Sequence, residues 1–231
     1  MTHLTVSTLA LIVTLLAPAL VLVNGALTDK HENCPQWAEM GECDANPGYM
    51  SVNCELSCEK YYSEEVDEEI AQIPSIFELS ADDIDGNEFK FSELEGKTTV
   101  IVNVASYCGY TESHYRGLVE LYDMFKGDNF EILAFPSNQF GAQEPDECPM
   151  IKRFAQKKGV EFRMMYKIDV NGANTHMVYR YLKHKTGVRN ITWNFATYFI
   201  VTPEGEILAE SQVEPMQLKD LVGDMLSAEE L

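Results

Sequence analysis

The chain has 231 residues, 45% of them hydrophobic, which is enough for one ordinary domain with a packed core and a smaller unit beside it. Its 37 acidic and 17 basic residues give a formal net charge of -20, which repels nucleic-acid phosphates and anionic lipids. We therefore expect neither nucleic acid nor an anionic membrane surface as a partner.

Residues 1–25 have the features of a secretory signal peptide. They contain no Lys, Arg, Asp or Glu, and Leu9–Val23 is an apolar stretch interrupted by Thr14 and Pro18. A stretch of this length suits the hydrophobic region of a signal peptide and is short for a membrane span. We expect cleavage after Gly25 and a protein of the secretory pathway, extracellular or in the endoplasmic reticulum lumen. The alternative is an uncleaved membrane anchor.

Four of the six cysteines lie in residues 34–58, a segment with almost no aliphatic core and the turn sequence NPG. Such a segment requires cross-links to hold one shape. The secretory pathway permits disulfides, whereas a four-cysteine zinc site, which the spacing also allows, suits a reducing compartment. We predict a disulfide-bonded module over residues 32–62, then an acidic linker over residues 63–73.

This module resembles the ShK-toxin-like domain, a small six-cysteine unit. The shared features are Trp37, GEC at 41–43, NPGYM at 46–50 and the final SC at 57–58. Because the first and last cysteines of that family are absent, the resemblance implies two remaining pairs, Cys34–Cys54 and Cys43–Cys58. Some relatives block potassium channels with a lysine, but residues 34–58 contain no Lys or Arg. We expect a spacer or docking module instead.

From residue 74 onward, the hydrophobic pattern alternates between strands and helices. Asp85-Gly86 separates two alternating runs, which is typical of a β-hairpin. Apolar runs and periodic apolar faces then predict, in chain order, a strand at 98–105, a helix around 115–125, a strand at 130–135, a helix at 149–158, a strand at 162–168, a helix around 177–182, strands at 197–201 and 206–209, and a helix around 218–225. Parallel strands with helical crossovers, followed by a hairpin and a helix, predict a thioredoxin-like α/β fold over residues 74–231.

Cys108 stands at the junction between the strand at 98–105 and the following helix. Unpaired backbone N–H groups and the helix dipole favour a thiolate there, which makes this cysteine a candidate nucleophile. Thr111 replaces the second cysteine of a C-x-x-C disulfide exchanger, so that activity is disfavoured. The alternative to a nucleophile is an inert buried cysteine.

Three motifs resemble those of the glutathione peroxidase family. They are NVAS followed by CG and Thr111 within residues 103–111, FPSNQFGAQEP at 135–145 and WNF at 193–195. The resemblance covers about residues 75–228. It implies a thioredoxin-fold peroxidase that reduces hydrogen peroxide and organic hydroperoxides.

The resemblance also implies four catalytic residues, which are Cys108, Gln143 (not Gln139), Trp193 and Asn194. In the family the thiolate attacks the terminal peroxide oxygen, which gives a sulfenic acid and releases water or an alcohol. Amide and indole N–H groups are suitable donors to the oxygen charge that develops. The alternatives are a non-catalytic thioredoxin-fold binding module of the secretory pathway and a protein disulfide oxidant.

The sulfenic acid must then be reduced. Many cysteine-type relatives carry a resolving cysteine at a position that is Gln156 here. Cys148 precedes Pro149 at a predicted helix start, where a thiolate is favoured although Asp146 and Glu147 oppose it. Cys148 is therefore a candidate resolving thiol, and an idle exposed thiol is the alternative.

The external reductant is expected to be glutathione or a protein of the thioredoxin or protein disulfide isomerase type. Relatives that act on phospholipid hydroperoxides often have lysines where this chain has Tyr110 and Thr197. Their loss weakens attraction for anionic glutathione and lipid headgroups, so small uncharged hydroperoxides are the expected substrates. The segment before Trp193 lacks the insertion through which tetrameric relatives assemble, and we expect a monomer.

Three further sequence features complete the expectations. Asn190-Ile191-Thr192 is a glycosylation sequon. His114 is expected at the surface rather than as a base for Cys108. Because no group of His, Cys and carboxylate residues has the spacing of a catalytic metal site, we expect no metal and no cofactor.

Overall fold

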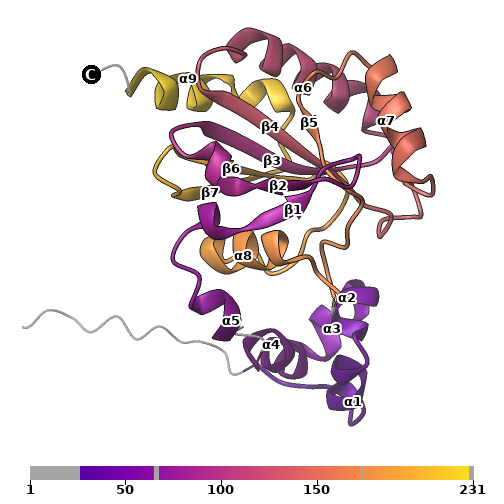
Figure 1. Ribbon diagram of the computed structural model, residues 1–231. Coiled ribbons are helices and arrows are strands. Elements are labelled where there is room, and N and C mark those ends of the chain that lie inside the picture. The colour runs from indigo at the N-terminus through magenta and orange to yellow at the C-terminus, as the bar shows by residue number, and fades with distance from the viewer. Residues whose placement is uncertain (1–26, 65–67, 173, 229–231) are drawn as a thin grey trace, which may run out of the picture.

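The computed structural model describes residues 27–64, 68–172 and 174–228. The predicted signal peptide and residues 229–231 lie outside the described part of the chain. Figure 1 shows a small helical unit, coloured indigo to purple, beside a larger α/β unit. Among the described residues, no helix has the length and apolar character that crossing a membrane requires.

Two disulfides hold the small unit together. Cys34 is bonded to Cys54 and Cys43 to Cys58, so both pairings implied by the ShK resemblance are confirmed. The buried core of this unit consists largely of these cysteines, and the cross-links therefore supply the constraint that a larger apolar core supplies elsewhere. Its helices are α1 (Cys34–Glu39), α2 (Glu42–Ala45), α3 (Pro47–Asn53) and α4 (Glu55–Glu64).

The predicted linker is partly helical and is packed against the larger unit. Ile70 of α5 (Glu68–Ala71) is fully buried in a core cluster that includes residues of α8 (Met177–Thr186). Two ion pairs also join the units, Arg189 with Glu59 and Arg180 with Glu69. Exposed ion pairs contribute about 0–1 kcal/mol, so the buried Ile70 side chain is the stronger contact.

A five-stranded mixed sheet forms the centre of the larger unit, in the order β5-β4-β3-β6-β7. Strand β3 is parallel to β4 and antiparallel to β6, and Val102 lies opposite Ala134 on one side and Tyr198 on the other. The predicted hairpin around Asp85-Gly86 forms a separate antiparallel pair. The strands are β1 (Ser80–Asp82), β2 (Glu88–Lys90), β3 (Thr98–Val104), β4 (Phe130–Pro136), β5 (Arg163–Met164), β6 (Thr197–Val201) and β7 (Ile207–Ser211).

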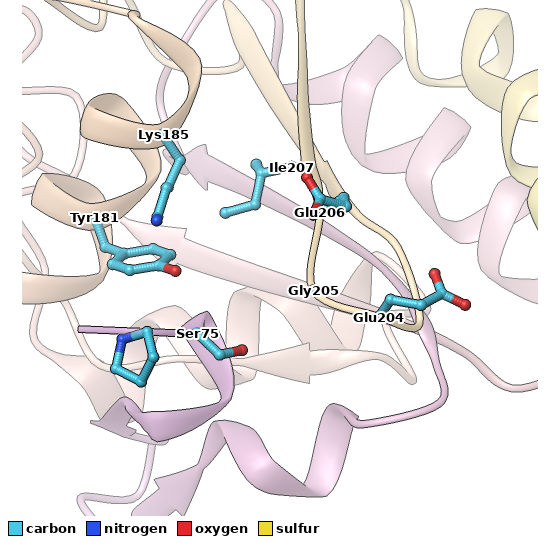
Figure 2. Close-up of a pocket in the computed structure, with 8 residues that line it drawn as sticks. Ser75, Tyr181, Lys185, Glu204, Gly205, Glu206 and Ile207 are labelled. Carbon is cyan, nitrogen blue, oxygen red and sulfur yellow. The ribbon is translucent and has the colours of Figure 1, made fainter. Parts of the chain in front are cut away.

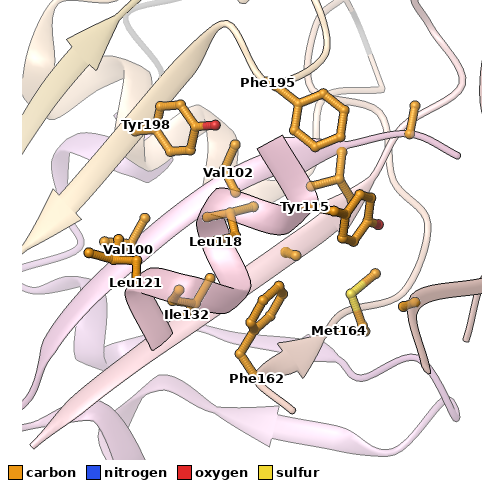
Figure 3. Packing of buried hydrophobic residues seen from close by; sticks show 14 of the residues in the cluster. Val100, Val102, Tyr115, Leu118, Leu121, Ile132, Phe162, Met164, Phe195 and Tyr198 are labelled. Carbon is orange, nitrogen blue, oxygen red and sulfur yellow. The ribbon is translucent and has the colours of Figure 1, made fainter. Parts of the chain in front are cut away.

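Helices cover both faces of this sheet, so all residues of β3 are buried. Successive side chains of a strand point to opposite faces. Accordingly, Val100 and Val102 belong to the cluster packed by α6, α7 and α9, whereas Ile101 belongs to the cluster packed by α8. Figure 3 shows Leu118 and Leu121 of α6 against the first cluster. The remaining elements are α6 (Thr111–Phe125), α7 (Cys148–Lys157), α9 (Lys219–Ala228), η1 (Ile76–Glu78), η2 (Phe91–Leu94) and η3 (Pro215–Leu218).

Strand β5 is shorter than the sequence predicts, because residues 165–168 leave the regular ladder. Met165 and Ile168 still donate backbone hydrogen bonds to β4, but Met165 also forms an antiparallel bridge with Asp83 of the hairpin region. Regular pairing with β4 thus ends at Met164, and the expected strand over 162–168 contains only the two residues of β5.

The packing of α6 leads to a stability prediction. Leu118 is fully buried beneath the sheet, and its truncation removes apolar contacts and leaves a cavity. We expect Leu118→Ala to lower the free energy of unfolding by about 3 kcal/mol in urea denaturation. Met124→Ala, at an exposed position of the same helix, should change it by less than about 0.5 kcal/mol. Equal effects of the two substitutions would contradict this packing.

Candidate active site

Thr111 organises the turn that carries Cys108. Its hydroxyl donates to the Ala105 carbonyl at 2.7 Å and accepts from the Cys108 N–H at 3.0 Å. The Thr111 N–H in turn donates to the Cys108 carbonyl at 3.1 Å. The residue that replaces the second cysteine of a C-x-x-C motif thus fixes the turn between β3 and α6. Cys108 is held there as a free thiol with 8% of its surface exposed.

Asn103, in the middle of the apolar run of β3, connects this turn to the WNF segment. Its side-chain nitrogen donates to the Asn194 side-chain oxygen at 3.2 Å and to the Trp193 carbonyl at 3.3 Å. Its backbone carbonyl accepts from the Phe195 N–H at 2.9 Å. Asn103 belongs to one of the three motifs, but no role is assigned to it from the sequence. A polar residue inside a predicted buried strand could have indicated one.

Gln143 joins the same network from a third segment. Its side-chain oxygen accepts from Asn194 Nδ2 at 3.4 Å, and its backbone carbonyl accepts from the Tyr107 N–H at 3.0 Å. The structure therefore brings the segments of Cys108, Gln143 and Asn194 together. The Gln143 side-chain oxygen thus faces the Asn194 amide.

The side chain of Gln139, in the same motif, makes different contacts. Its side-chain oxygen accepts from the N–H groups of Val170 and Asn171, and its nitrogen donates to the Asn171 carbonyl. These bonds tie the loop after β4 to the loop before α8. The Gln139 side chain thus links these two loops, whereas the Gln143 side chain contacts Asn194.

Exposed aromatic side chains lie on the segments that carry Cys108 and the WNF motif. Trp193 is 39% exposed and its ring lies 5.8 Å from that of Phe140. Tyr107 and Tyr110, on either side of Cys108 in the chain, are also exposed. The Tyr107 hydroxyl donates to the Asp146 carboxylate at 2.7 Å, and this hydrogen bond and the Asp146 charge raise the Tyr107 pKa. The mouth of the site is therefore aromatic and acidic.

Two residues next to the proposed donors have left-handed backbone conformations. Ala142 precedes Gln143 with φ 50°, and Phe195 follows Asn194 with φ 63°. A bulky non-glycine residue in this region costs about 1–3 kcal/mol, and such strain is concentrated at functional sites. The interior holds Phe195, which is buried against Tyr115 and His114, in this conformation.

Cys148, the candidate resolving thiol, is the first residue of α7 and a free thiol. It is buried in the same core cluster as Cys108, not exposed as an idle surface thiol would be. Gln156, near the other end of α7, is exposed. No disulfide joins Cys148 to Cys108 in this structure, where both are free thiols.

The surface position expected for His114 is wrong. His114 is buried on α6, where its Nδ1 lies 2.5 Å from the Tyr198 hydroxyl and its Nε2 lies 3.5 Å from the Glu214 carboxylate. Burial lowers its pKa, and the charge of Glu214 opposes that effect more weakly. His114 was expected on the solvent side of the helix, but α6 turns it toward the sheet and η3.

Two other expected positions are also partly or fully enclosed. Thr197 is buried in β6, where its hydroxyl lies 3.3 Å from that of Ser211. Asn190 of the sequon is half-buried and its side-chain oxygen is enclosed without a partner among the described residues. Among those residues, no group of three or more His, Cys, Asp or Glu side chains is arranged to hold a metal ion.

A separate pocket of about 160 Å³ lies between α8 and the β6–β7 turn (Figure 2). It is lined by polar residues that include Ser75, Tyr181, Lys185, Glu204 and Glu206. None of the predicted catalytic residues lines it. The candidate site is therefore the region where the Cys108, Gln143 and Asn194 segments meet, and not this pocket.

The fold and the site together define a class. The five-stranded mixed sheet with helices on both faces, and a cysteine between its central strand and the next helix, is a thioredoxin-like fold. A thioredoxin-family thiol:disulfide interchange protein from Chlorobium tepidum shares this fold, with a TM-score of 0.50 at 16% identity, covering 66% of this chain and 95% of that one. The predicted fold class is confirmed.

Comparison with known proteins narrows the class. Residues 76–183 match the glutathione peroxidase family model and residues 28–60 the ShK domain-like model. The glutathione peroxidase-like peroxiredoxin 2 of Saccharomyces cerevisiae is 42% identical over 160 residues, covering 66% of this chain and 98% of the relative. The peroxiredoxin gpx1 of Schizosaccharomyces pombe is 45% identical over 136 residues, covering 57% and 85%. The crystal structure of T. cruzi GPX1 superposes with a TM-score of 0.55 at 31% identity, covering 66% and 97%.

The chain belongs to the glutathione peroxidase family, and an ShK-like domain precedes its peroxidase domain. It is accordingly a thiol peroxidase.

The burial of His114 leads to a pH-dependent prediction. Because its pKa is lower in the folded than in the unfolded state, the stability it contributes is complete above the unfolded-state pKa and is lost as the pH falls through the folded-state pKa. We expect His114→Gln to lose less stability than the wild type between about pH 7 and about pH 5. Urea denaturation at both pH values measures this difference. Because each protein is compared with itself at the two pH values, a pH-independent effect of losing the Tyr198 contact cancels. Equal losses in the two proteins would contradict the assignment.

Proposed function

We propose that Cys108 is the nucleophile of this peroxidase. Its thiolate attacks the terminal oxygen of a hydroperoxide, the O–O bond breaks, and the sulfur becomes a sulfenic acid. The departing oxygen takes up a proton and leaves as water or an alcohol. The convergence of the Cys108, Gln143 and Asn194 segments through Asn103 and Tyr107 supports this proposal, since it joins segments that carry amide donors to the turn that holds a free thiol.

Gln143, Asn194 and Trp193 are proposed as donors to the reacting atoms. Their N–H groups stabilise first the thiolate and then the oxygen charge that develops as the peroxide bond breaks. The network of Asn103 supports this role, because donors that are already oriented need no reorganisation during the reaction.

Hydrogen peroxide and small uncharged hydroperoxides are the proposed substrates. The site has Tyr110 rather than a lysine beside Cys108, and Asp146 and Glu147 lie on the adjoining loop. These charges and the net charge of -20 weaken the attraction for anionic glutathione, which makes a thiol protein of the thioredoxin or protein disulfide isomerase type the favoured reductant.

A monomer in the secretory pathway is the proposed form of the protein. Two disulfides in the ShK-like module suit an oxidising compartment, as does the signal-like composition of residues 1–25. A glycan on Asn190 is proposed as well, because the sequon at 190–192 lies in the loop between α8 and β6.

The nucleophile is tested by stopped-flow mixing of the reduced protein with hydrogen peroxide. In a Trp37→Phe background, fluorescence reports Trp193 alone, because the chain has two tryptophans. We expect a rapid change in the parent that Cys108→Ser abolishes, since a serine hydroxyl is a far weaker nucleophile than a thiolate at neutral pH. Gln143→Ala should slow the change by about 100-fold. Gln156→Ala, an exposed matched control, should leave it within about twofold. An unchanged signal in Cys108→Ser would falsify the proposal.

The role of Cys148 is tested by mass spectrometry after one equivalent of peroxide. If Cys148 resolves the sulfenic acid, the wild type loses two hydrogens and forms a Cys108–Cys148 disulfide, with release of water. Cys148→Ser should instead accumulate sulfenic acid that dimedone traps. Persistence of the sulfenic acid to the same extent in both proteins would leave Cys148 without this role and assign reduction to an external thiol.

A further inference from the structure

Glu144 holds the turn of Cys108 against the loop of Gln143. The Ser106 hydroxyl donates to Glu144 Oε2 at 3.1 Å. The neighbouring pair is linked too, since the Tyr107 N–H donates to the Gln143 carbonyl. Ser106 and Tyr107, which precede Cys108, are thus bonded to Glu144 and Gln143 of the other loop.

The backbone of Glu144 is also linked to the end of β3. Its N–H donates to the Asn138 side-chain oxygen at 2.9 Å, and the Ser137 N–H donates to the Val104 carbonyl at the end of β3 at 3.0 Å. The carboxyl group consequently cannot shift without moving either the end of the central strand or the turn above it.

The carboxyl group is fully buried and only half satisfied. Glu144 has no exposed surface, and its Oε1 has no hydrogen-bond partner among the described residues. The hydroxyl of Tyr115, also fully buried, likewise lacks one there. A buried acidic group with an unpaired oxygen costs stability, and an apolar residue of similar volume is often at least as stable. Folding alone therefore gives no reason for a carboxyl group at this position.

We propose that Glu144 is a positioning residue whose charge state sets the reactivity of Cys108. The neutral carboxyl group joins the two loops without adding charge to the site. The carboxylate instead places a negative charge beside Ser106, which is two residues before the cysteine that must hold a thiolate. The two ionisations therefore compete, and the turn of Cys108 accommodates one negative charge more readily than two.

The electrostatics of the surroundings support this competition. Burial raises the pKa of Glu144 to about 7; the hydrogen bonds from Ser106 and the charge of Lys167 oppose the rise, and the charge of Asp146 adds to it. Burial and then the Glu144 charge raise the pKa of Tyr115 on α6. The same charge also contributes to the raised pKa of Tyr107, after its hydrogen bond to Asp146. The field of Glu144 thus reaches residues on both sides of Cys108 in the chain.

The test measures the pH dependence of Cys108 alkylation by iodoacetamide in a Cys148→Ser background. The inference rests on the proposed nucleophile, but alkylation does not require peroxide chemistry. If the parent does not react with peroxide, the proposed function is overturned, and the alkylation midpoint can still be measured. We expect Glu144→Gln, which is isosteric and neutral, to move the alkylation midpoint to lower pH by at least about half a unit. Glu147→Gln removes the same charge from an exposed neighbour and should move it by less than about 0.2 unit.

Ser106→Ala provides the second variant. Loss of its hydrogen bond keeps Glu144 neutral to higher pH, so the midpoint should move in the same direction as in Glu144→Gln, and the double variant should show less than the sum of the two shifts. A purely structural role of Glu144 predicts altered stability with an unmoved midpoint. Alkylation profiles of Glu144→Gln and Ser106→Ala that superimpose on the parent would overturn the proposal.

Discussion

The burial of β3 on both faces is the constraint on which the site depends. Helices cover this strand on both sides, so a polar group inside it gains a hydrogen bond only from another part of the chain. The Asn103 amide nitrogen donates to Trp193 and Asn194, and its backbone carbonyl accepts from Phe195. These three hydrogen bonds hold the WNF segment at the end of the strand, next to the turn that carries Cys108.

The turn itself shows how a thioredoxin-like scaffold is adapted to a different reaction. In a C-x-x-C protein the second cysteine captures the first as a disulfide, whereas here the Thr111 hydroxyl occupies that position and is engaged with the backbone on both sides. Cys108 is left without an adjacent sulfur. Any second thiol must come from another element, and Cys148 at the start of α7 is buried in the same core cluster.

The two domains achieve stability by different physical means. The peroxidase domain buries two large apolar clusters against its sheet, whereas the ShK-like domain buries little besides its two disulfides. Ile70 and the ion pairs of Glu59 and Glu69 join the two. The Glu59–Arg189 pair lies close in sequence to Trp193, so the small domain contacts the loop that leads into the candidate site.

The order of the strands and main helices in the larger unit, the two disulfides and the candidate site residues all follow from the amino-acid sequence, the last two through family motifs. Hydrophobic periodicity does not fix the length of a strand, since the segment 162–168 contains only the two residues of β5. The packing of distant elements places His114 in the interior, and it brings Asn103 to Asn194 across 91 residues and Glu144 to Ser106 across 38. The physical reason is that local patterns fix the face that a residue presents within its own element, whereas the partner of a buried polar group is fixed by how distant elements pack.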